Sequence, residues 1–370
     1  MTTLSSTRET ARFPVVFRAD GGETIGLGHI MRCLAVAEAL MERETRCLFA
    51  AAALPDAAER RLRASGVEVV RLNVSAGGDG DRAATAALAA HAGAVVLDGY
   101  GFGSGYRAGV AAVGRPVLAF DDGAFTGQHP PGPLSAALVV NASSGAVPAD
   151  YAVSAPGARL LLGPAHAPVR REIRHAAARP VLPLDRRRSV LLTFGGSDPL
   201  ALTAPCIRLL APRLPSGVRL VAVVGGGSPW LEDCRAAAAP FGERVAVHFD
   251  TPAMGELMAG AGLAVSAAGG TVAELAASAL PALLAVVADN QAPAAAAGAA
   301  GMPSWCRVVD VRGRGEQAAA RITAAALALW DDPPRRQAMS DAARGRVDGQ
   351  GAGRIAQALL NVMGVAMAGR

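Results

Sequence analysis

Short apolar runs rich in valine and leucine alternate with alanine-rich helical segments along nearly the whole chain. This alternation is typical of βαβ units, in which parallel strands form a sheet that helices cover on both faces. It therefore predicts an α/β protein with doubly wound parallel sheets. The predicted strands are 14–17, 46–51, 67–72, 94–97, 116–120 and 137–140 in the first half, and 189–194, 219–224, 245–249, 263–266 and 282–288 in the second.

The length of 370 residues favours two domains over one core. Around residues 174–188 the alternation is broken by Pro180, Pro183 and a run of arginines, as expected of a linker. We therefore predict a first domain over 1–176, a linker over 177–188, a second domain over 189–353 and a C-terminal helix over 354–370. Ligands of such folds bind beyond the carboxyl ends of the strands, so a cleft between the two domains is expected.

The charge pattern argues against nucleic acid as a partner. All 36 basic residues are arginine and the net charge is +5, but aromatic residues make up only 4% of the chain. Nucleic-acid binders usually concentrate basic residues with interleaved aromatics, and that pattern is missing here. A small anionic ligand is the expected partner instead.

The cysteines and the apolar segments indicate a cytoplasmic protein. Five scattered cysteines without C-x-x-C spacing favour neither a disulfide framework nor a zinc site. Residues 1–13 contain no apolar core of a signal peptide, and the most apolar later stretch, 257–288, is interrupted by Glu274 and Pro281. We therefore expect no membrane span.

A glycine-rich joint, Gly26-Leu27-Gly28, precedes His29 at the point where the first strand gives way to a helix. Such a joint exposes backbone N–H groups and the positive end of the helix, which together bind phosphate. His29 is therefore expected beside an anion site. The alternative is that the glycines serve the tight turn alone and that His29 merely caps the helix.

The same joint partly matches the dinucleotide-binding motif. Gly26 and Gly28 begin a G-x-G-x-x-G motif, but its third position is Met31, and the second strand ends without the acidic residue that holds a ribose. The dehydrogenase interpretation is therefore weak.

The second half repeats the phosphate-type pattern after two strands. In the first loop, Gly195-Gly196-Ser197, either Ser197 or Asp198 is expected to cap a helix that starts at Pro199. In the second, Thr271 and Glu274 fit the capping box T-x-x-E, which needs no ligand, although Glu274 could instead bind a ribose diol.

Polar side chains also follow the last predicted strand, at Asp289-Asn290-Gln291. They place three hydrogen-bonding groups at the carboxyl end of that strand. The structural alternative is an ordinary Asx-type turn.

Taken together, these motifs resemble the UDP-sugar hydrolases of pseudaminic acid biosynthesis. Relatives of that family include the glycosyltransferase that adds N-acetylglucosamine to the peptidoglycan lipid precursor. The matching residues cover nearly the whole chain in the right order: Arg18-Ala19-Asp20, Gly26-x-Gly28-His29-x-x-Arg32-Cys33-Leu34, Leu97-Asp98-Gly99-Tyr100, Phe120-Asp121-Asp122, Val140-Asn141, Tyr151, Leu160 to Pro164, Arg170-Arg171-Glu172, Phe194 to Pro199, Gly269-Gly270-Thr271 with Glu274, Asn290-Gln291, and Asp348-Gly349-x-Gly351-x-x-Arg354.

The resemblance implies the GT-B architecture, in which two Rossmann-like domains face each other across the cleft. It implies that the second domain holds UDP, that the first faces the sugar, and that no cofactor is needed. His29, Tyr100 and Asn290 would surround the anomeric carbon and its attacking water. The residues implied to bind the UDP-sugar are Arg18, Asp20, Gly28, Arg32, Gly195, Gly196, Ser197, Phe249, Met254, Gly270, Thr271, Glu274 and Gln291.

The expected chemistry is hydrolysis of a UDP-amino sugar without a metal. Displacement of UDP passes through an oxocarbenium-like state, which needs anion stabilisation by helix N-termini or arginines and an oriented water rather than a strong acid. His29 at a positive helix end is suited to accept a proton from that water. Tyr100 would fix the histidine or the sugar, or else be an ordinary buried tyrosine.

The acidic pairs Asp79-Gly80-Asp81 and Asp121-Asp122 are not assigned to a cation. The first is expected to be a loop and an N-cap.

The sequence leaves open whether the acceptor is water or a hydroxyl group. A glycosyltransferase on the same scaffold would place a sugar or small-molecule hydroxyl where a hydrolase places water. The polar extension before Arg12 and the insert around Gly127 to Pro133 could shape an acceptor pocket. A binding module without activity is a third interpretation, disfavoured by the joint presence of His29, Tyr100 and Asn290.

Overall fold

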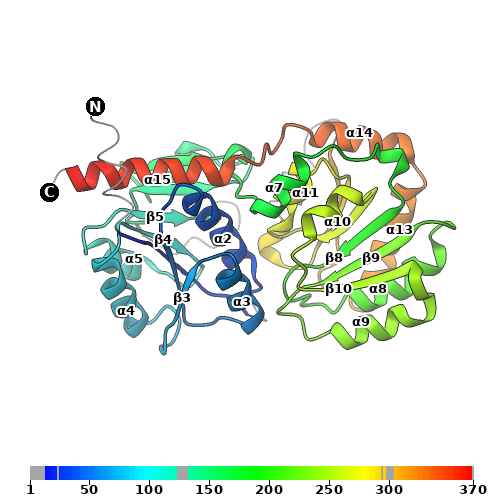
Figure 1. The fold of residues 1–370 in the computed structure, drawn as a ribbon, viewed down its shortest axis with the longest axis horizontal. Coiled ribbons are helices and arrows are strands. Elements are labelled where there is room, and N and C mark those ends of the chain that lie inside the picture. Colours follow the sequence, from blue (N-terminus) through cyan, green and yellow to red (C-terminus); the bar gives the residue numbers. More distant parts are fainter. Residues whose placement is uncertain (1–12, 23–24, 123–131, 293–294, 297–303, 369–370) are drawn as a thin grey trace. The chain divides into compact units, whose positions relative to one another are not determined.

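The computed structural model describes residues 13–22, 25–122, 132–292, 295–296 and 304–368, and they form two compact units (Figure 1). Unit 1 comprises the described residues within 1–22, 29–170 and 350–370, and unit 2 comprises those within 23–28 and 171–349. The joint before His29 therefore belongs to unit 2, while His29 itself belongs to unit 1. The extension before Arg12 and most of the insert around Gly127 to Pro133 lie outside the described residues.

Unit 1 contains a seven-stranded parallel sheet in the order β3-β2-β1-β4-β5-β6-β7. Its strands are β1 (Val15–Ala19), β2 (Cys47–Ala51), β3 (Glu68–Arg71), β4 (Ala94–Asp98), β5 (Val117–Phe120), β6 (Leu138–Asn141) and β7 (Arg159–Leu162). Its helices are α2 (Gly28–Met41, of which the first residue is counted with unit 2), α3 (Asp56–Ala64), α4 (Asp79–Ala90), α5 (Ser104–Ala111) and α15 (Gly351–Ala368), with short 3₁₀ turns at Pro148–Tyr151 and Pro164–His166.

Unit 2 contains a six-stranded parallel sheet in the order β10-β9-β8-β11-β12-β13. Its strands are β8 (Ser189–Thr193), β9 (Arg219–Val224), β10 (Val245–Phe249), β11 (Leu263–Ala267), β12 (Ala282–Val286) and β13 (Cys306–Asp310). Its helices are α7 (Arg171–Ala177), α8 (Thr203–Leu210), α9 (Leu231–Ala238), α10 (Met254–Gly260), α11 (Thr271–Ala277), α13 (Gln317–Trp330) and α14 (Pro333–Ala343), with 3₁₀ turns at Leu184–Arg186, Ala211–Arg213, Ala239–Arg244 and Asp289–Gln291.

The prediction of two doubly wound parallel sheets is confirmed. Each predicted strand is present, with ends shifted by at most two residues. Two strands were missed, β7 and β13, and both lie at a sheet edge. An edge strand buries fewer side chains, and the exposed Arg159 and Asp310 weaken the apolar runs of these two.

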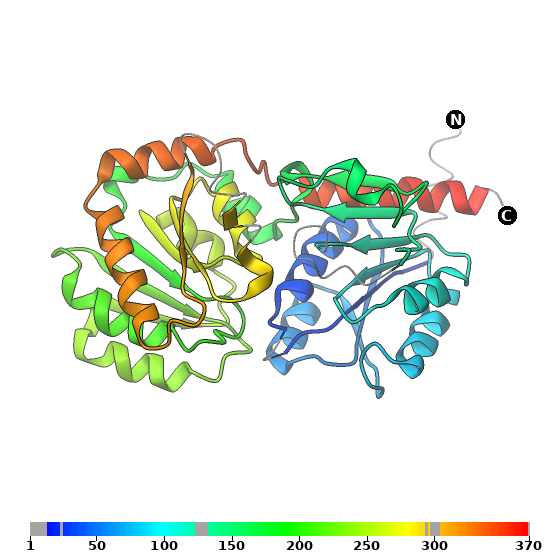
Figure 2. The same cartoon turned by 180° about the vertical axis from the view of Figure 1, so that it is seen from behind.

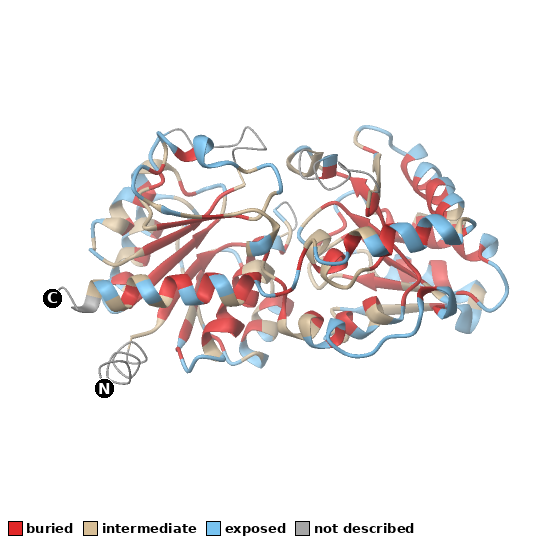
Figure 3. Cartoon of the chain, turned by 90° about the horizontal axis from the view of Figure 1, so that it is seen from above, coloured by how far each residue is buried: buried red, intermediate tan, exposed pale blue. Residues whose placement is uncertain are grey.

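Strand residues alternate between the two faces of each sheet. In unit 2, Val190 and Leu192 of β8 and Leu263 and Val265 of β11 join one buried cluster with α8, α9 and α13. The intervening residues, such as Leu191, face the side on which α7, α10 and α11 pack together. Both faces are thus covered, as a parallel sheet requires, and Figure 3 shows the strands buried and the exposed residues on helix surfaces and loops.

The C-terminal helix α15 packs along unit 1 (Figure 2). Its Met363 is fully buried and contacts Gly93, where a Cβ would lie too close to the methionine methyl group. Over the described part of the chain, no helix has the length and apolarity to cross a membrane.

The strand order reverses once in each sheet, between β1 and β4 and between β8 and β11. Ligands of doubly wound sheets bind beyond the carboxyl ends of the strands at this reversal. Each unit therefore has one preferred place for a ligand, at the carboxyl ends of the strands on either side of its reversal.

Candidate functional site

His29 and Asp98 meet at the strand reversal of unit 1. Asp98 ends β4 and pairs in register with Ala19 at the end of β1, after which the chain turns into α2. Val95 and Leu97 point into the cluster beneath α4 and α5, so the side chain of Asp98 points to the opposite face, toward α2. His29 Nδ1 lies 2.6 Å from Asp98 Oδ1. The histidine is 8% exposed and the aspartate is completely buried.

This contact fixes which imidazole nitrogen carries the proton. Burial alone would raise the pKa of Asp98, but the charges and hydrogen bonds of Arg32 and His29 hold it well below its ordinary value. Asp98 is therefore a carboxylate, which only accepts hydrogen bonds. At 2.6 Å the proton of the pair must sit on Nδ1, and Nε2 is left as the acceptor nitrogen of the neutral ring.

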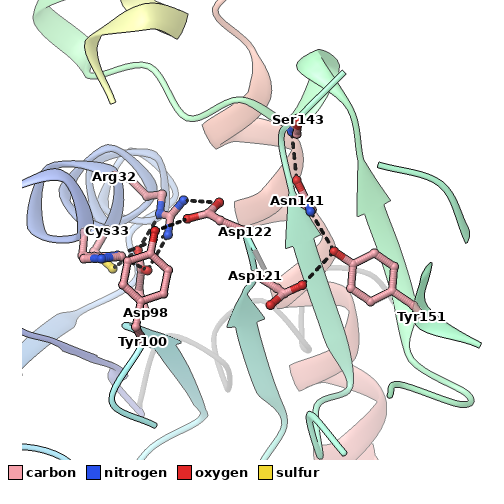
Figure 4. A network of polar contacts seen from close by, with 10 residues as sticks. Arg32, Cys33, Asp98, Tyr100, Asp121, Asp122, Asn141, Ser143 and Tyr151 are labelled. Carbon is pink, nitrogen blue, oxygen red and sulfur yellow. Dashed lines mark hydrogen bonds and ion pairs between the residues drawn. The ribbon is translucent and has the colours of Figure 1, made fainter. Parts of the chain in front are cut away.

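Arg32 lies one turn after His29 on α2 and bridges two carboxylates (Figure 4). Its Nε and Nη2 donate to the two oxygens of Asp98, each at 2.6 Å, and Nη1 donates to Asp122 Oδ1 at 2.9 Å. The guanidinium also stands over the ring of Phe120, 4.7 Å from its centroid. Arg32 was expected to bind the UDP-sugar. Its three guanidinium nitrogens instead donate hydrogen bonds to carboxylates of unit 1, those of Asp98 and Asp122.

Tyr100 stands beside this group. Its ring meets the His29 ring edge to face, with centroids 4.9 Å apart and planes at 83°. Its hydroxyl donates to Asp122 Oδ2 at 3.5 Å. The side chain is 37% exposed, so the alternative of an ordinary buried tyrosine is wrong.

A second polar chain joins the ends of β5 and β6 (Figure 4). Tyr151 donates its hydroxyl hydrogen to Asp121 Oδ2 at 2.9 Å and accepts a hydrogen bond from Asn141 Nδ2 at 2.8 Å. Asn141 Oδ1 in turn accepts from the backbone N–H of Ser143 at 3.0 Å. Asp121, Asn141 and Tyr151 are all buried, so this chain fixes the strand ends near Asp122.

Arg18 and Asp20 form a buried cluster of their own. Arg18 has no exposed surface, and it pairs with Asp20 at 2.7 Å and with both oxygens of Asp81 at 2.6 and 2.8 Å. Asp20 also accepts from the backbone N–H groups of Ala52 and Ala53. Both residues were expected in the UDP-sugar site, and their side chains are engaged within unit 1.

The Asp79-Gly80-Asp81 stretch was expected to be a loop and an N-cap, and this is wrong. α4 begins at Asp79, and Gly78 occupies the N-cap. Asp81 is instead buried in the first turn, where Arg18, Tyr106 and the N–H of Gly77 hydrogen-bond its carboxylate.

In unit 2, glycine loops crowd together beyond β8 and β9. The loop Gly195-Gly196-Ser197 lies so close to Gly225 that a Cβ there would stand 2.5 Å from the carbonyl oxygen of Gly195. Gly227 N–H donates to the carbonyl of Gly196 at 3.0 Å. The residues Gly225 to Gly227 were missed from sequence, although three glycines directly after a predicted strand were a visible signal.

The joint before His29 lies on these loops. A Cβ on Gly196 would stand 2.7 Å from Leu27 Cγ, and one on Gly270 would stand 3.9 Å from Gly28 Cα. Residues 26–28 and the loops after β8 and β11 are therefore neighbours within unit 2. The structure brings together the three segments that the sequence singled out as phosphate-type.

The helix start expected at Pro199 is wrong. α8 begins at Thr203, and the side chain of Asp198 accepts from the backbone N–H groups of Leu202 and Thr203 and from the Thr203 hydroxyl. Burial raises the pKa of Asp198, against the opposing effect of these hydrogen bonds. Asp198 thus stabilises the start of the helix from five residues upstream, which lengthens the loop after β8.

The capping box expected at Thr271 and Glu274 is also absent. Gly270 is the N-cap of α11 and no side chain caps the helix, so Thr271 occupies the first helical position. Glu274 is 6% exposed. Thr271 is therefore not the N-cap that the capping-box interpretation required.

The segment after β12 forms the 3₁₀ turn Asp289–Gln291. Gln291 Oε1 accepts from Val287 N–H at 3.1 Å, and its Nε2 lies 3.7 Å from where a Cβ on Gly269 would be. Asp289 forms an ion pair with Arg312 at 2.6 Å. Asn290, the middle residue of the turn, is half-buried. Gln291 thus lies beside the loop after β11.

Phe249 and Met254 lie on either side of the loop after β10. Phe249 ends the strand with 40% of its surface exposed, whereas Met254 starts α10 and is 6% exposed. Only the phenylalanine presents an apolar surface to solvent.

No cluster of three or more metal-ligating side chains occurs in the part of the chain that the structure describes. All five cysteines are buried as free thiols. Burial and the nearby Asp98 carboxylate raise the pKa of Cys33, so this thiol beside His29 stays protonated.

No protein-family model matches this chain, and no curated protein matches it in sequence. Solved structures match over its length. MurG from Acinetobacter baumannii has a TM-score of 0.58 at 18% identity, and the match covers 94% of this chain and 99% of that one. UDP-GlcNAc 2-epimerase from Neisseria meningitidis, bound to UDP-GlcNAc, has a TM-score of 0.62 at 12% identity with the same coverages.

HepE from Anabaena, in complex with UDP and glucose, has a TM-score of 0.55 at 14% identity, again over 94% and 99% of the two chains. At these identities the likeness concerns the fold. Together with the seven- and six-stranded parallel sheets, it shows that this chain has the GT-B fold.

Proposed function

We propose that this chain hydrolyses a UDP-amino sugar at the anomeric carbon and releases UDP and the free sugar. The observation that carries the proposal is the 2.6 Å contact between His29 Nδ1 and Asp98, which leaves Nε2 as a proton acceptor at the strand reversal of unit 1. A histidine oriented in this way by a buried carboxylate is suited to general-base catalysis.

The UDP part of the substrate is assigned to unit 2. The glycine loops at residues 195–197 and 269–271 lie beside the joint at 26–28. Backbone N–H groups of such loops bind diphosphate oxygens. Glu274 is assigned to the ribose hydroxyls, and Phe249 to the uracil side. Two of the matching structures contain UDP or UDP-GlcNAc, which supports this ligand class.

The proposed step conserves atoms and charge. The oxygen of a water attacks the anomeric carbon while the bond from that carbon to the diphosphate oxygen breaks, and UDP takes the bonding electron pair. His29 Nε2 accepts the proton of the water, and Asp98 stabilises the imidazolium that results. Tyr100 and Asn290 are assigned to orient the water and the sugar.

A glycosyltransferase is the second candidate. MurG and the kitacinnamycin glycotransferase are among the matching structures, and the same histidine would activate an acceptor hydroxyl as readily as water. The two reactions share every step except the identity of the nucleophile.

The deciding experiment incubates the protein with a panel of UDP-amino sugars, including a UDP-2,4-diacetamido-2,4,6-trideoxyhexose, with and without sugar acceptors. Free UDP and the sugar product are quantified separately. Free sugar formed without an acceptor supports hydrolysis, and a product formed only with an acceptor supports transfer. Release of neither UDP nor sugar from any member of the panel contradicts both.

A further inference from the structure

The guanidinium of Arg32 is held by the protein rather than presented to a ligand. Its Nε and Nη2 donate to the two oxygens of Asp98 at 2.6 Å, and its Nη1 donates to Asp122 Oδ1 at 2.9 Å. Only 22% of the side chain is exposed. This bidentate geometry is the strongest that an arginine makes with a carboxylate, and a diphosphate would have to compete with two carboxylates for the same cation.

The same guanidinium adjoins the imidazole. Arg32 Nη2 lies 3.2 Å from His29 Nδ1. Because Nδ1 carries its proton toward Asp98, two donors face each other there, and a second proton on the ring would bring two cations into contact. Arg32 therefore acts on His29 in two ways. It fixes the carboxylate that orients the ring, and its charge opposes protonation of Nε2.

The other charged and titratable groups around His29 come from neighbouring elements. Asp98 at the end of β4 and Asp122 after β5 are anionic neighbours, and Tyr100 packs on the ring from the loop between β4 and α5. Arg107 on α5 is 3% exposed, and burial lowers its pKa against the opposing charges of Asp121 and Asp98. Cys33 faces Asp98 as a neutral thiol.

We propose that Arg32 is a positioning residue for His29 and not a ligand of the UDP-sugar: it locks Asp98 against Nδ1 and keeps the imidazole ready to accept a proton at Nε2. This inference rests on the proposed function, in which His29 is the base. It predicts that Arg32 variants lose turnover without losing UDP affinity.

The test compares Arg32→Lys, Arg32→Met and Asp122→Asn with the wild type. For each protein, UDP affinity is measured by calorimetry and kcat is measured against pH. In Arg32→Met the loss of a cation favours the imidazolium, so we expect the acid limb of the profile to move up by about one pH unit. In Asp122→Asn the loss of an anion should move the acid limb to lower pH. Arg32→Lys keeps the charge and should leave the limb in place while lowering kcat about tenfold, because the fork is lost.

UDP affinity should stay within about twofold of the wild type in all three variants, since ligand contact is not the role proposed. A loss of affinity of about tenfold or more in Arg32→Lys, with an unmoved acid limb in Arg32→Met, would overturn the proposal and make Arg32 a diphosphate ligand. Shifts of the same sign in Arg32→Met and Asp122→Asn would overturn it as well, because a charge effect requires opposite signs.

A spectroscopic readout separates this inference from the proposed function. The ring ¹⁵N resonances of His29, identified by their loss in His29→Gln, report ring protonation against pH without any substrate. If no UDP-sugar is turned over, the proposed function fails, while opposite shifts of this curve in Arg32→Met and Asp122→Asn still support the action of Arg32 on His29. An unchanged curve in Arg32→Met contradicts it whatever the substrate.

Discussion

The imidazole of His29 and the carboxylate of Asp98 are joined at 2.6 Å although they lie 69 residues apart in the chain. The sheet order explains how they meet. β4 is the neighbour of β1 across the strand reversal, so the last residue of β4 faces the first turn of the helix that follows β1. The pairing is thus a consequence of the doubly wound topology, and it gives the first unit a histidine with a defined tautomer.

We expect His29→Leu to abolish UDP release while UDP affinity stays nearly unchanged, because the UDP contacts are assigned to the other unit. A loss of about 10²-fold or more in turnover is the usual size of a general-base effect. Turnover is measured as free UDP and affinity by calorimetry. Turnover like that of the wild type in this variant would remove His29 from the mechanism.

We expect Asp98→Asn to lower the free energy of unfolding by about 3 kcal/mol at pH 7, because Arg32, whose side chain is only 22% exposed, loses its bidentate partner. The pKa of Asp98 is lowered by folding, so its contribution is complete above the pKa of the unfolded chain and disappears as the pH falls toward the folded value. The gap between wild type and variant should therefore narrow below about pH 4. Urea unfolding at pH 7, 4 and 2.5 measures it, and a gap independent of pH would contradict the role of the charge.

The alternation of apolar runs predicted the fold because every inner strand of a covered parallel sheet must be apolar, as in β4 and β12. The edge strand β7 was not predicted because only one of its four residues, Leu161, is buried and the strand starts with an exposed arginine. The glycine loops and His29 were visible as local motifs. Asp98 stood in the sequence only as one residue of a motif, because its role depends on the order of strands in the sheet.

Local rules failed where tertiary contacts decided the helix ends. Thr271 matched a capping box, yet Gly270 is the N-cap of α11. Asp198 accepts hydrogen bonds from the first N–H groups of α8, although that helix starts five residues later. Arg32 looked like an anion-binding arginine, and the sequence held no sign that Asp98 and Asp122 would hold it. Both cases depend on residues brought close by folding.

We expect Glu274→Ala to weaken UDP binding by about tenfold, because a carboxylate that accepts from a ribose diol contributes on the order of 1.5 kcal/mol. Glu274→Gln serves as the matched control, since it keeps the side-chain size. If Glu274→Ala lowers only the free energy of unfolding and leaves UDP affinity intact, the residue has a structural role.

EDTA should leave the rate of UDP release unchanged, because the leaving diphosphate is assigned to backbone N–H groups of the loops after β8 and β11. The rate is measured after dialysis against EDTA and again after addition of Mg²⁺. Loss of turnover that Mg²⁺ restores would refute the metal-free mechanism.

Gly196 is expected to tolerate no side chain while Leu27 is present. A Cβ at position 196 would stand 2.7 Å from Leu27 Cγ and 2.8 Å from Leu27 Cβ, and the backbone there is not in the left-handed region. Contact with this one side chain, and not backbone strain, therefore excludes alanine. Gly196→Ala should lower the free energy of unfolding by about 1–3 kcal/mol and weaken UDP binding, since the joint would move off the loop.

Leu27→Gly removes the atoms that cause this clash, so adding Gly196→Ala to it should cost much less than adding the same change to the wild type. Gly225→Ala is the matched control, because its Cβ would meet the backbone of Gly195 and Gly196 at 2.5 Å and Leu27→Gly cannot relieve that contact. Two double-mutant cycles are measured by unfolding free energy and UDP affinity. The first combines Leu27→Gly with Gly196→Ala, and the second combines Leu27→Gly with Gly225→Ala. If the effects of Leu27→Gly and Gly196→Ala are additive, the joint at residues 26–28 does not contact the loop at residues 195–197. That result would contradict the placement of these two phosphate-type segments beside each other.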